Sequence, residues 1–162
     1  MSRKLTTPAG RRRLEARLAA AEAEYARVCA SNPEAAEAGD SSVWHDNFAY
    51  EENQRLMHQW SRRVRDLRAT LAELELTTTP KAPEAVAVGC AIVVADTTTG
   101  RQQRYILAGW DDGDLSARRL AYNSPLGGAL IGARLGEARE VRTPAGSREL
   151  EIISIENDEE AP

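Results

Sequence analysis

Hydrophobic positions in the first half of the chain recur at alternating intervals of four and three residues. In the first such segment they are Leu14, Leu18, Ala21, Tyr25 and Val28. This spacing is the a/d pattern of a helix that buries one narrow face on a partner helix. Thr7 suits the N-cap position and Pro8 the first helical position, so we expect the helix to begin there. Asn32 and Pro33 interrupt the pattern, and we expect a kink or break near residue 32.

A second segment repeats the pattern more clearly. Its apolar positions are Tyr50, Met57, Trp60, Val64, Leu67, Leu71 and Leu74. Asn53 occupies the skipped position, where a polar residue can fix the register of paired helices. Two helices with such narrow apolar faces would bury them on each other, so residues 9–75 are predicted to form an antiparallel coiled-coil hairpin.

The helical period ends at the stretch "LTTTPKAPEA", residues 76–85, whose prolines and threonines are typical of a linker. Beyond it, residues 85–96 and 101–110 are predicted strands, and residues 137–156 a hairpin. Ser124 and Pro125 suit the start of one short helix, 125–131. We therefore predict an α+β chain: a helical hairpin over 1–79, a linker over 80–84, and a small antiparallel sheet with one short helix over 85–162.

Charge and composition exclude several classes of function. The formal net charge of −4 lies entirely in residues 80–162, which hold 9 basic and 13 acidic residues. Sequence-independent binding of nucleic acid requires a dense stripe of basic residues, so this charge balance argues against it. The two cysteines have no motif spacing, and no stretch resembles a signal peptide or a membrane span. We expect a cytoplasmic protein that does not bind membranes.

Acids and aromatics gather between the two predicted helices, in "EAGDSSVWHDNFAYEEN", residues 37–53, which we call the acidic tip. Asp40 and Asp46 are hard oxygen ligands of the kind that Mg²⁺ takes. Each can also have a purely structural role, because Asp40 suits a solvated turn and Asp46 suits the N-cap of the second helix. Trp44 is equally suited to packing beneath the tip and to contacting a partner.

The order of these features, and one long motif above all, resembles the Gre family of bacterial transcript-cleavage factors. The run "NSPLGGALIGARLGEAREVRTPAGSRELEIISIE", residues 123–156, is similar without a gap to that family's C-terminal signature. The stretch "TPAGRRRLEARL" is similar to the start of the family's coiled coil. The resemblance covers nearly the whole chain and implies an FKBP-like topology for the C-terminal domain.

The resemblance implies a partner, bacterial RNA polymerase, bound by the C-terminal domain at the rim of its secondary channel. The coiled coil would enter the channel and place Asp40 and Asp46 near the polymerase's catalytic Mg²⁺, where the polymerase hydrolyses the 3′ end of a backtracked transcript. The chain would have no cofactor of its own and would meet the nascent RNA 3′ end only indirectly. As partner-binding residues we predict Trp44, Phe48, Trp110, Asp112, Ser124 and Pro125.

The acidic tip departs from the family pattern in two ways. The two acids stand six residues apart instead of three, and the second is aspartate instead of glutamate. Both changes move the second carboxylate, and near-octahedral Mg²⁺ tolerates such shifts poorly. Two alternatives to a cleavage factor therefore stay open: a secondary-channel regulator or inhibitor without cleavage activity, and, more remotely, an FKBP-like prolyl isomerase.

Overall fold

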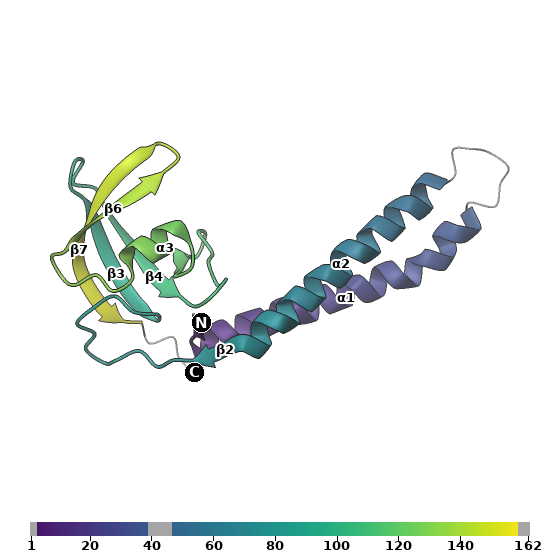
Figure 1. Cartoon of the computed structure of the whole chain (residues 1–162), viewed down its shortest axis with the longest axis horizontal. Helices are drawn as coiled ribbons and strands as arrows, with labels where there is room; N and C mark the ends of the chain where they lie inside the picture. Colours follow the sequence, from purple (N-terminus) through teal and green to yellow (C-terminus); the bar gives the residue numbers. More distant parts are fainter. Residues whose placement is uncertain (1–2, 39–46, 159–162) are drawn as a thin grey trace. The chain divides into compact units, whose positions relative to one another are not determined.

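The computed structural model describes residues 3–38 and 47–158, and side chains over 3–31 and 48–158 (Figure 1). The fold is α+β, which confirms the predicted class. Two compact units divide the chain: residues 14–72 form the helical unit, and residues 1–13 with 73–162 form the sheet unit. The predicted tip residues Asp40, Trp44 and Asp46 lie outside the residues whose side chains are described.

The helical unit consists of most of two long helices, α1, Pro8–Ala38, and α2, Asn47–Glu73. The first residues of α1, up to Arg13, belong to the sheet unit. Thr7 caps α1, since its hydroxyl oxygen accepts a hydrogen bond from the Gly10 N–H at 3.0 Å. The predicted a/d positions are the buried ones, among them Leu14, Ala21, Val28, Val64 and Leu67. The expected break near residue 32 is wrong, because α1 continues through Pro33. A proline removes only one backbone donor, and the alanines and glutamates that follow are strong helix formers.

Asn53 is a polar group inside the helix pair, only 8% exposed. Its side-chain amide donates to the Val28 carbonyl of the other helix at 3.2 Å and to the Ser31 hydroxyl at 2.9 Å. Its own carbonyl oxygen, Oδ1, is buried without a hydrogen-bond partner. The residue thus links the helices in one register while carrying an unsatisfied buried acceptor, which costs stability.

We expect Asn53→Leu to stabilise the helical unit by about 1 kcal/mol, because it removes the buried acceptor and fills an a/d position with an apolar side chain. Thermal unfolding followed by the helical circular-dichroism signal measures the change. Asn53→Ala is the control, since it removes the same polar group without filling the space. A lower melting temperature for Asn53→Leu would show that the two cross-helix hydrogen bonds outweigh the buried acceptor.

The sheet unit holds a five-stranded sheet in the order β5-β4-β3-β7-β6. Its elements in chain order are β3 Cys90–Asp96, β4 Gln102–Ala108, β5 Arg119–Ala121, the short helix α3 Pro125–Leu130, β6 Ala138–Thr143 and β7 Gly146–Asn157. The sheet is mixed, which corrects the expectation of an antiparallel one, because β5 runs parallel to β4. The loop 109–118 between them reverses the chain twice, at Asp111 and Arg118, whose φ angles of 52° and 56° are left-handed.

The core of the sheet unit lies between one face of this sheet and α3, as Figure 1 shows. Its largest fully buried side chains include Ile92, Leu107, Leu130, Val141 and Ile152. Along β3 the core side chains Cys90, Ile92 and Val94 recur at every second position, as the pleat of a strand requires. The core therefore holds α3 against the sheet near β5 and β6.

Two short strands that the sequence pattern does not reveal attach the N-terminal segment to the sheet unit. β1, Lys4–Thr6, pairs in parallel with β2, Leu74–Leu76. The Trp110 N–H donates to the Leu5 carbonyl at 2.9 Å, and the Leu5 N–H donates to the Tyr122 hydroxyl at the same distance. The first residues of the chain are thereby part of the same unit as the sheet.

Candidate functional site

Two loops of the sheet unit, 109–118 and 122–124, lie beside one another and hold most of the partner-binding residues predicted there. The Asp111 N–H donates to the Asn123 side-chain oxygen at 3.0 Å, and the Asn123 amide donates back to the Asp111 carboxylate at 2.9 Å. Trp110 meets Tyr122 edge to face, with ring centroids 6.0 Å apart. These contacts hold the loop that carries Trp110 against the segment that leads into Pro125, and Asn123 links the two.

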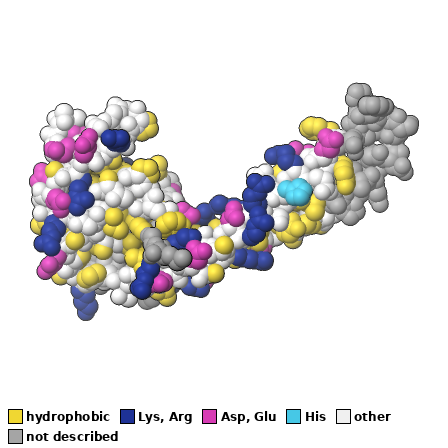
Figure 2. Space-filling model, viewed as in Figure 1, with side chains coloured by type: hydrophobic (Ala, Val, Ile, Leu, Met, Phe, Trp, Pro, Cys, Tyr) yellow, Lys and Arg dark blue, Asp and Glu magenta, His cyan; other side chains and the backbone are white. Residues whose placement is uncertain are grey.

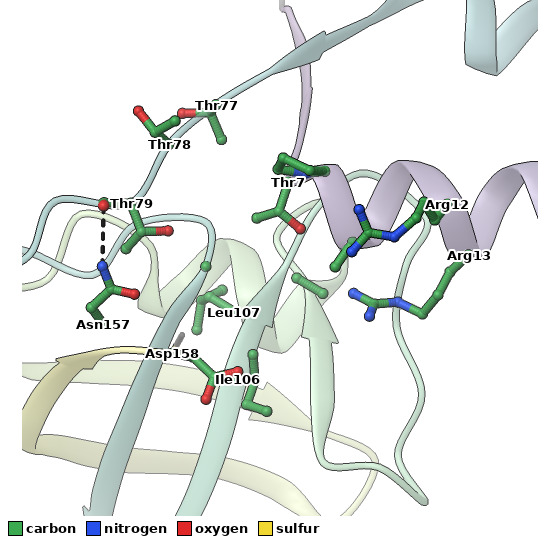
Figure 3. A pocket seen from close by; sticks show the side chains of 14 residues that line it. Thr7, Arg12, Arg13, Thr77, Thr78, Thr79, Ile106, Leu107, Asn157 and Asp158 are labelled. Atoms are coloured by element: carbon green, nitrogen blue, oxygen red, sulfur yellow. Dashed lines mark hydrogen bonds between the residues drawn. The ribbon is translucent and has the colours of Figure 1, made fainter. Parts of the chain in front are cut away.

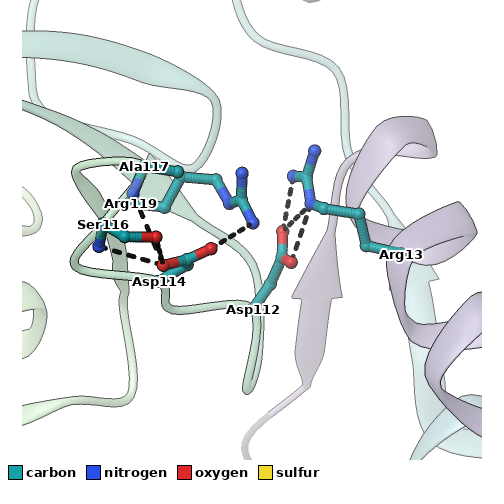
Figure 4. Close-up of polar contacts among 6 residues, drawn as sticks. All are labelled: Arg13, Asp112, Asp114, Ser116, Ala117 and Arg119. Carbon is teal, nitrogen blue, oxygen red and sulfur yellow. Dashed lines mark hydrogen bonds and ion pairs between the residues drawn. The ribbon is translucent and has the colours of Figure 1, made fainter.

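The loop 109–118 is stiffened by Asp114 (Figure 4). One carboxylate oxygen accepts from the Ser116 hydroxyl at 2.6 Å and from the Ser116 N–H at 3.0 Å, while Arg119 lies 3.5 Å from the other. The Ser116 hydroxyl, helped by backbone N–H groups and Arg119, lowers the pKa of Asp114 below its ordinary value. The carboxylate is therefore ionised at neutral pH and fixes the turn that presents Leu115, whose side chain is 75% exposed.

Asp112 has an internal role in the same loop. Its side chain is 4% exposed and accepts a bidentate hydrogen bond from the Arg13 guanidinium, with Nε–Oδ1 at 2.8 Å and Nη2–Oδ2 at 2.6 Å (Figure 4). The pair ties the second turn of α1 to the loop. The Asp112 carboxylate is accordingly engaged inside the molecule, while the neighbouring Asp111 is the exposed acid.

Ser124 and Pro125 open α3 as the sequence predicts. The Ser124 hydroxyl oxygen accepts from the Gly127 N–H at 3.1 Å and donates to the Ala121 carbonyl at 2.6 Å. Ser124 therefore acts as an N-cap that also anchors the helix to β5. Pro125 is exposed beside it, so the proline ring is the part of this pair available to a partner.

A cavity of about 560 Å³ lies elsewhere in the sheet unit, and Figure 3 shows its lining. Its lining includes Ile106, Leu107 and Ala108 of β4, several threonines, and Arg12. A prolyl isomerase site needs an apolar pocket lined by aromatic rings, and none of the fourteen lining residues is aromatic. This cavity does not support the isomerase alternative.

The helical unit supplies the other predicted contacts. Phe48, in the first turn of α2, is 75% exposed, as a partner-binding aromatic would be. Arg62, Arg63, Arg65 and Arg68 are all exposed along α2, and Figure 2 shows basic side chains gathered on the helices. Within the described residues no three His, Cys, Asp or Glu side chains group as metal ligands, and no helix there is long and apolar enough to cross a membrane.

Comparison with known proteins identifies the family. The family model described as "Transcription elongation factor, GreA/GreB, C-term" matches residues 80–157. The chain is 30% identical to the transcription elongation factor GreA of Thioalkalivibrio sulfidiphilus, over 96% of this chain and 98% of the relative. The chain belongs to the GreA/GreB family. It is also 31% identical to GreA of a Psychrobacter strain, with the same coverage.

The crystal structure of GreA factor homolog 1 (Gfh1) of Thermus thermophilus aligns with 95% of this chain and 99% of that one, at 19% identity and a TM-score of 0.45. The GreA/GreB resemblance stated from the sequence is confirmed by the curated relatives. Membership makes the chain a transcription elongation factor of the Gre type.

Proposed function

We propose that this chain binds RNA polymerase at its secondary channel and assists the polymerase in hydrolysing the 3′ end of backtracked transcripts. One observation carries the proposal: Asp40 and Asp46 fall in the connection between two helices packed as a hairpin. A helix of about 30 residues is about 45 Å long, so the hairpin can carry these acids far from its base. The GreA names of its relatives support the same function.

In this proposal the chain contributes positioned oxygen ligands and no complete active site. The Mg²⁺ belongs to the polymerase, and the Asp40 and Asp46 carboxylates would add to its oxygen ligands and to those of its water. Asn53 would keep the two helices in register and so help to position the two carboxylates. Position matters because a small misplacement of a catalytic group can reduce a rate about 100-fold. The sheet unit would anchor the factor through the surface around Trp110, Leu115, Asn123 and Pro125.

The second candidate is a factor that occupies the channel without promoting cleavage. It is favoured by the spacing of the two acids, six residues instead of the family's three, and by the shorter second side chain. If the two carboxylates fail to converge, the hairpin still fills the channel and blocks access to the active centre. We accordingly expect cleavage to be stimulated only weakly.

Release of the RNA 3′ fragment from a stalled, backtracked elongation complex tests the proposal. We expect Asp40→Ala and Asp46→Ala each to abolish whatever stimulation the unaltered protein gives, without weakening polymerase binding. Glu51→Ala is the matched control, since it removes an exposed acid of α2 just beyond the two carboxylates. Stimulation that survives replacement of both aspartates would refute their role. Inhibition by the unaltered protein would establish the channel-occupying alternative.

A further inference from the structure

Half of strand β4 has an edge that no other strand of the described residues covers. β5 pairs only with Ile106–Ala108, while β3 pairs with Gln102–Ile106 from the other side. The Ile106 N–H donates outward to the Arg118 carbonyl at 2.9 Å, and the Arg101 carbonyl accepts from the Asp96 N–H on the β3 side at 2.9 Å. Alternation along an antiparallel strand then points the N–H and C=O groups of Gln102 and Arg104 outward. No hydrogen bond within the described part of the chain uses these groups.

The groove beside this edge is basic. A hollow of about 320 Å³ is lined by Arg101, Gln102, Gln103, Arg104 and Arg118. Arg101 and Arg118 are exposed and form no ion pair with any residue that the structure describes. Arg104 lies 3.6 Å from the Asp158 carboxylate, so one of the three arginines already meets an acid. The edge thus combines unpaired backbone groups with an uncompensated positive charge.

Charged side chains at a strand edge often have a protective role alone, which is to prevent other strands from pairing with that edge. Here, however, all three charges around the groove have one sign, and they would attract an acidic strand while repelling a basic one. A nucleic acid would satisfy the arginines but has no N–H and C=O groups at strand spacing to pair with Gln102 and Arg104. An acidic polypeptide satisfies both the charges and the backbone.

We propose that this edge of β4 binds an extended acidic segment of a partner protein by strand addition. The segment would pair with residues 102–105 of β4, on the same side of β4 on which β5 pairs with residues 106–108. Its backbone would exchange hydrogen bonds with Gln102 and Arg104. Side chains alternate along a strand, so Arg101 and Arg104 leave opposite faces of the sheet, and the segment would need acidic side chains on both of its faces to meet them and Arg118. The inference does not depend on the acidic tip and goes beyond the cleavage function proposed above.

Fluorescence anisotropy with the full-length protein tests the proposal, using a fluorescein-labelled heptapeptide with glutamates on both faces of the strand, Glu-Glu-Val-Glu-Glu-Val-Glu. We expect Arg101→Ala and Arg118→Ala each to weaken binding about two- to fivefold. Arg142→Ala is the matched control, because Arg142 is exposed on β6, away from the β4 edge. It is expected to leave the affinity unchanged.

Removing the backbone N–H of Gln102 distinguishes strand pairing from simple charge attraction. Proline is tolerated at an edge strand where its missing N–H would face solvent, so Gln102→Pro keeps the β3 ladder and loses one outward donor. We expect it to weaken peptide binding about fivefold relative to Gln102→Ala. The same peptide N-methylated at alternate residues tests this point from the ligand's side and needs no variant; we expect it not to bind.

Three results would overturn the proposal. The first is no binding of the peptide by the unaltered protein. The second is equal binding of the plain and N-methylated peptides, which would reduce the interaction to charge alone. The third is displacement of the peptide by a thymidine oligonucleotide at equal concentration, which would make the groove a nucleic-acid site.

Discussion

Replacing Gly127 by alanine is expected to lower the free energy of unfolding of the sheet unit by about 3 kcal/mol. A Cβ atom there would lie 2.1 Å from the Ala121 carbonyl oxygen and 2.9 Å from its carbon. Both atoms belong to the backbone of β5, which is paired with β4, so they cannot move away as a flexible side chain would. The added methyl group would push α3 off the sheet and disturb the cap that Ser124 makes to the Gly127 N–H.

Gly128 provides the matched control one residue further along the same helix. Its Cβ would meet only the Tyr122 carbonyl oxygen, at 3.4 Å, and the position is exposed. Alanine is favoured over glycine within a helix by up to about 1 kcal/mol, so Gly128→Ala is expected to be neutral or stabilising. Both variants restrict the unfolded chain equally, so their difference reports the folded state.

Urea denaturation followed by the amide NMR signals of the five-stranded sheet measures both variants without interference from the helical unit. We expect a large loss of stability for Gly127→Ala and either no change or a small gain for Gly128→Ala. Equal midpoints for the two variants would mean that α3 can shift on the sheet at little cost. The spacing of α3 above β5 would then not be fixed by the core.

Long periodic elements of this fold are predictable from the sequence because their signal is repeated. The a/d pattern from Leu14 to Val28 and the apolar run of β3 each rest on several residues that are buried in the structure. Three-residue strands offer no such repetition. β1, β2 and β5 exist because tertiary pairing holds them, and the parallel direction of β5 depends on left-handed backbone at Asp111 and Arg118, residue types that do not demand it.

The candidate site is predictable as a region and less so as individual side chains. The sequence "DDGD" marks a turn with three acids, but not which acid is exposed. In the structure Asp111 bonds Asn123 at the surface, Asp112 is buried, and Asp114 fixes the loop's own backbone. In the same way, the run Arg11-Arg12-Arg13 does not show which arginine forms an ion pair with the loop. In the structure it is Arg13 that pairs with Asp112.

That pair carries the second large effect: Arg13→Met is expected to destabilise the attachment of the N-terminal segment by about 3 kcal/mol. Removing the cation leaves a carboxylate that is only 4% exposed without its counter-charge, and breaking a buried pair from one side costs about 3–5 kcal/mol. Asp112→Asn is expected to cost less, about 1 kcal/mol, because the Arg13 side chain is 27% exposed and can still reach water. The asymmetry follows from the unequal burial of the two partners.

Hydrogen exchange at two amides reads this effect where it occurs. The Trp110 N–H bonds the Leu5 carbonyl and the Thr77 N–H bonds the Thr6 carbonyl, both at the junction that Arg13 helps to hold. A loss of 3 kcal/mol corresponds to exchange faster by about 100-fold in Arg13→Met. Arg12→Met is the matched control, since Arg12 is an exposed neighbour that makes no ion pair with Asp112, and its exchange rates are expected to stay unchanged. Faster exchange in Asp112→Asn than in Arg13→Met would contradict this prediction. It would mean that an unpaired Arg13 costs more stability than an unpaired Asp112 carboxylate.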